Sequence, residues 1–150
     1  MLGGTGGPHL GSFSLIDVLS HGRACAVLNP YYTVLFAQVI QEPLKLVGDI
    51  FKEAGYIKEE ISHLGGKPLG LAVARGMIAL EQDLNFPTTL KQAGATREHL
   101  ERMLAAAKNP QLKMKLQNMP TPMDAERGDL DRLMRPVLEA AYTGDLSLIP

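Results

Sequence analysis

The sequence predicts an all-α domain of roughly six to eight helices. In successive segments the apolar residues recur at intervals of three or four, which is the period of a helix with one buried face. The sequence contains no alternating apolar and polar run bounded by turn residues, so no strand is predicted. Hydrophobic residues make up 45% of the 150 residues, which is enough for a compact core.

The first elements are a glycine-rich lead-in over residues 1–11 and a short helix over residues 12–20. The glycines at the start of the lead-in are Gly3, Gly4, Gly6 and Gly7. They could cradle a phosphate, but no predicted strand precedes them and no Gly-Lys-Ser or Gly-Lys-Thr sequence follows. We therefore expect a flexible tail, or a loop that packs against another element. The short helix carries several apolar residues, and Gly22 follows its end.

Five further helical segments are predicted over residues 23–37, 43–55, 68–84, 96–107 and 124–142. Pro30 and Pro136 are expected to kink or divide the first and the last of these segments. Thr96 and Asp124 are suitable N-cap residues, because their side-chain oxygens can accept hydrogen bonds from free backbone N–H groups. Gly144 is expected to end the last segment. Together with residues 12–20, these segments form a single helical metal-binding domain over residues 12–150.

The charge balance excludes two classes of partner. The net charge is −1 and the isoelectric point is near 6.4, which offers no basic surface for nucleic acid or for an anionic membrane. The uncharged stretch over residues 24–41 contains Pro30 and is interpreted as a buried helix, not a membrane span. Cys25 is the only cysteine, so no intramolecular disulfide can form, and no signal peptide is recognised. A cytoplasmic location is therefore expected.

Two of the four histidines are candidate metal ligands. His9 and His21 lie at predicted loop–helix junctions in the most apolar part of the chain, and neutral imidazole is a common metal ligand. Asp17 precedes His21 by four residues, so its carboxylate could join a metal site or orient His21 through a hydrogen bond. Two histidines alone also fit a structural role, since metal sites need three or four ligands. His63 and His99 are predicted to be solvated surface residues.

A longer pattern surrounds these histidines and consists of Pro8-His9-Leu10-Gly11, His21-Gly22-Arg23-Ala24-Cys25-Ala26 and Asn29-Pro30. This pattern resembles the C-terminal signature of the iron-containing (group III) alcohol dehydrogenases. Residues 86–90 with Gly94, and residues 118–122, resemble later motifs of the family, so the resemblance covers nearly the whole chain. It implies the C-terminal helical domain of the dehydroquinate synthase-like superfamily, which follows an N-terminal nucleotide-binding domain.

The resemblance also implies a metal site. Members of the family hold a divalent ion, iron or zinc, with one aspartate and three histidines, of which the last two match His9 and His21. These two lie closer together than is usual in the family, and Phe13 stands where a further, non-ligating histidine is often found. Ser12 and Phe13 are expected to line or back the pocket, and Asp17 to support His21.

The expected function is the metal-binding part of an NAD(P)-dependent alcohol dehydrogenase that interconverts alcohols with aldehydes or ketones. The metal would polarise the substrate oxygen, and hydride would pass to NAD(P) in the other domain. The aspartate, the first histidine and the nucleotide-binding domain have no counterpart in this sequence. We therefore expect a fragment or split gene product that is inactive alone. Cys25 is expected to be a small buried side chain near the pocket rather than a ligand.

The alternative is a non-catalytic helical interaction module. Such a module would pair with a separate nucleotide-binding chain, or with itself as a homo-oligomer, and would need no metal. The dehydrogenase hypothesis predicts that His9 and His21 come together beside an open cleft and an exposed apolar patch. The module hypothesis predicts that self-association buries such a patch.

Overall fold

The computed structural model describes residues 6–150, and this part of the chain contains helices and no strand, which confirms the predicted class. The helices are α1 (Gly7–Ser12), α2 (His21–Phe36), α3 (Gln41–Glu53), α4 (Gly66–Asp83), α5 (Arg97–Ala107), α6 (Lys113–Gln117) and α7 (Arg135–Thr143). Short 3₁₀ turns lie at Pro110–Leu112, Ala125–Arg127 and Leu146–Leu148, and a π-helical turn lies at Leu130–Met134. Within residues 6–150, no helix combines the length and the apolar character needed to cross a membrane.

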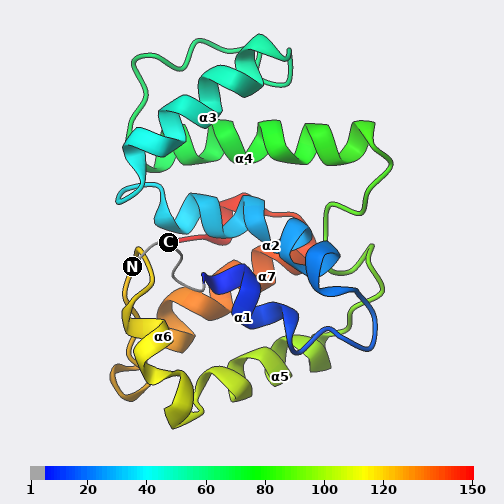
Figure 1. The fold of residues 1–150 in the computed structure, drawn as a ribbon, viewed down its shortest axis with the longest axis vertical. Helices are drawn as coiled ribbons and strands as arrows, with labels where there is room; N and C mark the ends of the chain where they lie inside the picture. Colours follow the sequence, from blue (N-terminus) through cyan, green and yellow to red (C-terminus); the bar gives the residue numbers. More distant parts are fainter. Residues whose placement is uncertain (1–5) are drawn as a thin grey trace.

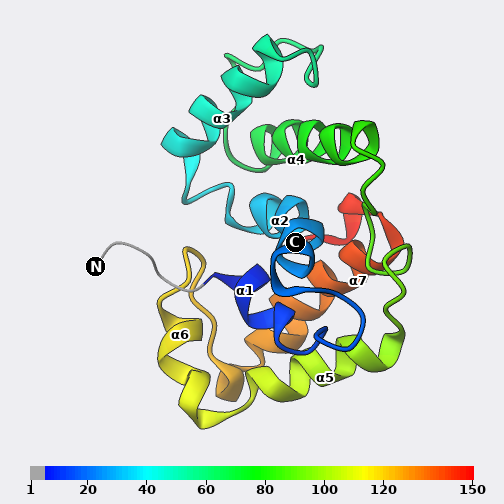
Figure 2. The ribbon, with the colours of Figure 1, turned by 45° about the vertical axis from the view of Figure 1, so that its right-hand side comes forward.

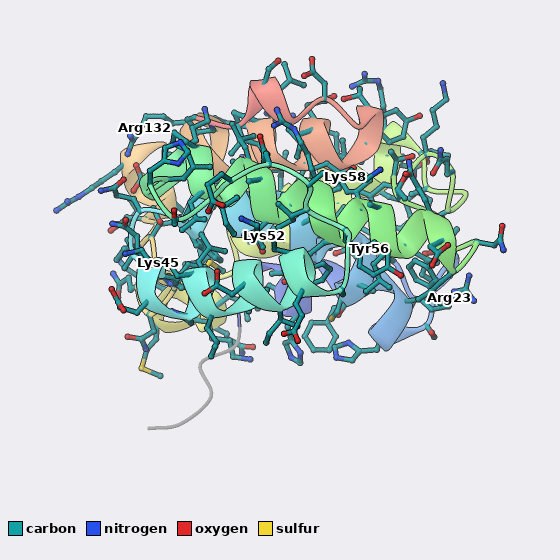
Figure 3. All side chains as sticks on the ribbon, turned by 90° about the horizontal axis from the view of Figure 1, so that it is seen from above. Arg23, Lys45, Lys52, Tyr56, Lys58 and Arg132 are labelled. Atoms are coloured by element: carbon teal, nitrogen blue, oxygen red, sulfur yellow. The ribbon has the colours of Figure 1, made fainter. Side chains whose placement is uncertain are left out.

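The helices are stacked in three tiers (Figures 1 and 2). α3 and α4 form the upper tier, α2 and α7 cross the middle, and α1, α5 and α6 lie below them. Seen from above, α3 and α4 run side by side, and Arg23 marks the N-terminal end of α2 (Figure 3). α2 packs against α1, α4 and α7, whereas α3 packs mainly against α4. The helix that begins with His21 is thus the central element of the molecule.

Burial explains why the sequence of α2 is so apolar. Ten of its sixteen residues are buried, and the tyrosines Tyr31 and Tyr32 are among the most deeply buried side chains. The Tyr31 hydroxyl donates a hydrogen bond of 2.7 Å to the Thr88 carbonyl, which satisfies it in the core. Pro30 lies inside the helix, and α2 continues through it to Phe36 instead of restarting. The first three residues of α2 are exposed, so this end of the buried helix reaches the surface.

The first helix lies earlier in the chain than predicted. The prediction placed a helix over residues 12–20, but α1 ends at Ser12, and residues 13–20 form turns. Most of α1 therefore comes from the lead-in predicted over residues 1–11. Gly3 and Gly4 lie outside the described residues.

Glycine in α1 allows the close approach of α1 to α2. A Cβ atom at Gly7 would lie 2.1 Å from the Tyr32 ring, and one at Gly11 would lie 2.9 Å from the Leu28 side chain. Both distances are shorter than van der Waals contact, and a buried aromatic ring cannot move aside without disturbing its neighbours. These glycines therefore act as packing contacts, because they set how close α1 lies to α2.

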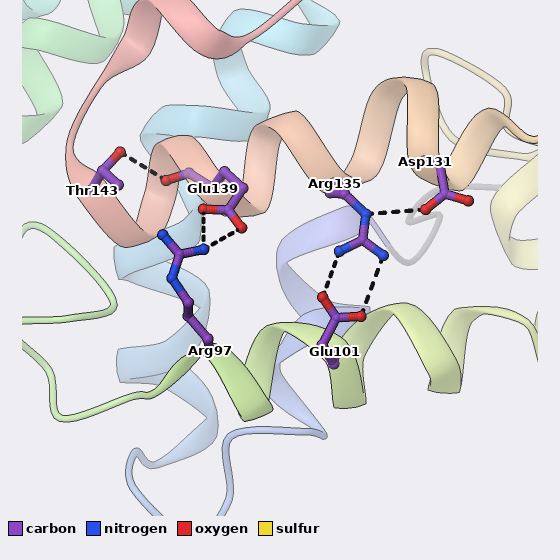
Figure 4. Close-up of polar contacts among 6 residues, drawn as sticks. All are labelled: Arg97, Glu101, Asp131, Arg135, Glu139 and Thr143. Atoms are coloured by element: carbon purple, nitrogen blue, oxygen red, sulfur yellow. Dashed lines mark hydrogen bonds and ion pairs between the residues drawn. The ribbon is translucent and has the colours of Figure 1, made fainter.

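Arginine ion pairs join α5 to the region of α7 (Figure 4). Arg97 donates two hydrogen bonds to the Glu139 carboxylate, at 2.6 and 2.8 Å. Arg135 contacts the carboxylates of both Glu101 and Asp131. Exposed ion pairs contribute only about 0–1 kcal/mol each, so the buried apolar face of α5 holds the helix and the ion pairs fix its register. α5 also contacts α1, which links it to the site described below.

The ends of several later helices follow the predicted signals. Thr96 directly precedes α5, and the Asp124 side chain accepts a hydrogen bond from a backbone N–H two residues later. Pro136 divides the predicted 124–142 segment, since it lies in the first turn of α7 after the π-helical turn. Gly144 ends α7 with a φ of 88°, a left-handed conformation that glycine adopts without strain.

The packing of α1 predicts different effects for two glycine substitutions. We expect Gly7→Ala to lower the free energy of unfolding by about 1–3 kcal/mol, because the new methyl group overlaps the buried Tyr32 ring. Gly22→Ala is the matched control, since its Cβ would meet no atom within 4 Å. We expect it to leave stability unchanged or to raise it by up to about 1 kcal/mol. Urea denaturation followed by circular dichroism measures both, and equal stability of the two variants would contradict the packing.

Candidate metal centre

His9 and His21 come together, although no helix forms between them. His9 lies in α1, and His21 is the first residue of α2; the turns of residues 13–20 reverse the chain between the two helices. The imidazole centroids are 4.7 Å apart, and the rings are nearly perpendicular, at 84°. His21 is exposed and His9 is half-buried. The contact of α1 with α2 therefore places two candidate ligands side by side at the surface.

Ser12 determines which nitrogen of His21 is free. The buried Ser12 hydroxyl donates its hydrogen to the His9 carbonyl, at 2.6 Å. The same oxygen lies 2.7 Å from Nδ1 of His21. A hydroxyl has one hydrogen, so Ser12 must accept from Nδ1–H, and Nε2 of the neutral ring keeps a free lone pair. This hydrogen bond fixes the tautomer in which Nε2 can bind a metal.

Cys25 lies beside that free nitrogen. The Cys25 Sγ is 3.8 Å from Nε2 of His21, which lies one turn earlier in α2. The Cys25 side chain is half-buried. The candidate ligand atoms of His9, His21 and Cys25 all lie within 4.8 Å of one another. In the described part of the chain, no other group of three histidine, cysteine or acidic side chains is placed in this way. The sequence-based expectation of a small buried side chain therefore misses how Cys25 is turned toward His21.

The surroundings of His9 favour its neutral form. The pKa of His9 is lowered from its usual value, first by desolvation and then by repulsion between a protonated His9 and the neighbouring basic groups of His21 and Lys115. A neutral imidazole is the form that binds metals, because protonation occupies the lone pair that the metal needs.

Asp17 has a different role from the one predicted. Its carboxylate accepts hydrogen bonds from His99 Nε2 at 3.2 Å and from Arg102 at 3.1 Å, not from His21. His99 is only 7% exposed, which corrects the prediction of a solvated surface residue. The Thr96 backbone N–H donates to Nδ1 of His99, so Nε2 carries the hydrogen that Asp17 accepts. Asp17 therefore ties the turns after α1 to α5 and supports the metal centre only indirectly.

Phe13 forms an apolar border of the centre. Its ring packs edge-to-face on His9, with centroids 4.9 Å apart, and lies 6.0 Å from the His21 ring. Phe13 is 55% exposed, and Ile16 in the following turns is 74% exposed. The centre therefore has an exposed apolar side chain, that of Phe13, at its border.

An open hollow of about 330 Å³ lies between α2 and α4. Its lining residues are Ala26, Asn29, Pro30, Phe51, Met77, Leu80, Glu81, Leu84 and Phe86. Glu81 is the one ionisable group among them, and its buried Oε2 atom has no hydrogen-bond partner. Burial raises the pKa of this carboxyl to about 7. Glu81 is not among the site residues predicted from the sequence; its one sequence signal is its place on the same helical face as Met77, Leu80 and Leu84.

Comparisons with known proteins do not extend this description. No family model matches the chain, and no curated protein and no solved structure matches it. The resemblance to iron-containing alcohol dehydrogenases therefore depends on the sequence motifs, and the candidate metal centre depends on the contacts described above.

The role of Ser12 can be tested without a metal. We expect ¹⁵N NMR to show the Nδ1–H tautomer of His21 as the major neutral form, because Ser12 accepts that hydrogen. In Ser12→Ala the proportion of Nε2–H tautomer should increase. Ser20→Ala is the matched control, since Ser20 precedes His21 and its side chain caps no helix N–H. Asp17→Asn should also leave the tautomer unchanged, and a shift in that variant would instead favour Asp17 as the partner of His21.

Proposed function

We propose that this chain is the helical, metal-binding domain of an NAD(P)-dependent alcohol dehydrogenase of the iron-containing type. The observation that carries the proposal is the pairing of His9 with His21, which are the two residues that match ligands of that family. Their rings lie 4.7 Å apart, and Nε2 of His21 has a free lone pair. The all-helical fold is compatible with the C-terminal domain of the dehydroquinate synthase-like superfamily, and that finer assignment is part of the proposal.

The residues around the centre have separable roles. His9 and His21 would hold a divalent ion, iron or zinc, and Ser12 would orient His21 through the Nδ1 hydrogen bond. A bound ion would act as a Lewis acid that polarises an alcohol or carbonyl oxygen. Phe13 packs against His9 and would border the bound substrate, where its ring would exclude water from one side of the centre.

The remaining parts of the enzyme would come from a second, nucleotide-binding domain. Such a domain would supply NAD(P) and the aspartate and histidine that complete the ligand set of the family. It would also cover the exposed side chains of Phe13 and Ile16. On this proposal the chain alone binds metal but does not oxidise alcohols.

A second candidate, an interaction module, is favoured by a separate observation. Leu46 and Ile50 of α3 are large apolar residues, yet they are 64% and 56% exposed. They lie four residues apart and so share one face of the helix. This face is a candidate contact for another chain and does not involve His9 or His21.

Metal titration tests the proposed function. We expect calorimetry on the tag-free chain to show zinc and, without oxygen, iron(II) binding at dissociation constants on the order of micromolar or tighter. His21→Ala should weaken binding at least about tenfold, since losing even a supporting residue typically costs about 10–100-fold. His63→Ala is the matched control because His63 is exposed, as predicted, and lies outside the cluster.

Two results would count against the metal-binding proposal. One is the absence of measurable binding, which would favour the interaction module. The other is equal binding by the wild type, His21→Ala and His63→Ala, which would mean that the metal binds at a site without His21. If binding depends on His21, the next test is alcohol oxidation after adding a nucleotide-binding domain in trans.

A further inference from the structure

Cys25 adds a third potential ligand to the two histidines. Its Sγ lies 3.8 Å from Nε2 of His21, and all three candidate ligand atoms lie within 4.8 Å of one another. The family resemblance implies only aspartate and histidine ligands, so it does not account for a thiol turned toward this nitrogen. In the metal-free chain this contact is a weak hydrogen bond from the Cys25 thiol to Nε2, and the same two atoms are placed to share a metal ion.

The distance from Cys25 to His21 is close to that between two ligands of one ion. Zinc binds sulfur at about 2.3 Å and nitrogen at about 2.0–2.1 Å, and a tetrahedral angle then separates the two ligand atoms by about 3.6 Å. The observed 3.8 Å differs little from this value. The corresponding separation between two imidazole nitrogens is about 3.4 Å. By rotating its side chain, His9 can bring a ring nitrogen to about this distance from Nε2 of His21, because the His9 ring is only half-buried.

The helix fixes Cys25 and His21 relative to each other. The two residues are four positions apart in α2 and so lie on one face of the helix. Ala24, between His21 and Cys25, and Leu28, after Cys25, are fully buried, so this part of α2 is held against the core. Ser12 engages Nδ1 of His21 and leaves Nε2, the nitrogen nearer to Cys25, free to bind. The α2 backbone and the tautomer of His21 are therefore both defined before a metal binds.

We propose that Cys25 is a metal ligand, so that α1 and α2 alone form a two-nitrogen, one-sulfur centre for zinc. The inference rests on the proposed metal-binding function and names an additional ligand for it. On binding, the S–H proton leaves to solvent and an S–metal bond forms, without transfer of electrons. Thiolate is a soft ligand that favours zinc over magnesium, calcium or manganese. In this chain by itself, the three ligands leave the fourth position of a tetrahedral ion to a water molecule or to a ligand from another domain.

Cobalt(II) spectroscopy tests the sulfur–metal bond directly. Cobalt(II) replaces zinc in tetrahedral sites, and a bound thiolate gives a near-ultraviolet charge-transfer band in addition to the visible d–d bands. The chain has one cysteine, so such a band can report only on Cys25. We expect the wild-type chain to show both kinds of band. In Cys25→Ser the charge-transfer band should disappear, and zinc affinity should fall at least about tenfold. Far-ultraviolet circular dichroism of the variant checks that the fold is kept.

Each outcome separates this inference from the proposed function. Loss of the charge-transfer band in Cys25→Ser, with loss of both kinds of band in His21→Ala, supports a site that contains both residues. Visible bands that depend on His21 without any charge-transfer band would overturn the role of Cys25 and leave the proposed metal function intact. Absence of all cobalt bands from the wild-type chain would overturn both. An unchanged zinc affinity in Cys25→Ser would also exclude Cys25 as a ligand.

Discussion

The packing of α1 on the buried helix α2 determines the arrangement of the candidate metal centre. Most of α2 is apolar and is buried against three other helices. Its first three residues, in contrast, are all exposed. Gly7 and Gly11 let α1 lie directly on α2, because any larger residue would overlap Tyr32 or Leu28. His9 is carried by α1 between these glycines. The two histidines therefore meet because the helices that carry them pack closely.

The hydrogen bond of Ser12 turns this packing contact into a chemically defined site. It links the His9 carbonyl to Nδ1 of His21, so the backbone of α1 and the ring orientation at the start of α2 are fixed together. Organising the ligands before binding reduces the conformational entropy lost when a metal binds. Desolvation also lowers the pKa of His9, which favours the neutral form that can bind a metal. Phe13 is exposed beside these groups, so the centre lies at the surface of the molecule.

The sequence predicted the helical class because side-chain spacing is a local property, and the N-cap positions of Thr96 and Asp124 were recovered for the same reason. It misplaced α1 because glycine has no side chain from which a helical period can be recognised. Asp17 and Cys25 both lie four residues from His21, but α2 begins at His21, so only Cys25 shares its helical face. The contact of Asp17 with His99 joins residues 82 positions apart, which no local pattern encodes.

Anomalous diffraction at the zinc edge, measured on crystals of the zinc-loaded chain, would locate the metal directly. We expect a zinc peak bonded to Nε2 of His21, a ring nitrogen of His9 and Sγ of Cys25, with Ser12 still bonded to Nδ1 of His21. A zinc peak bonded through Nδ1 of His21, or located away from the contact of α1 with α2, would contradict it.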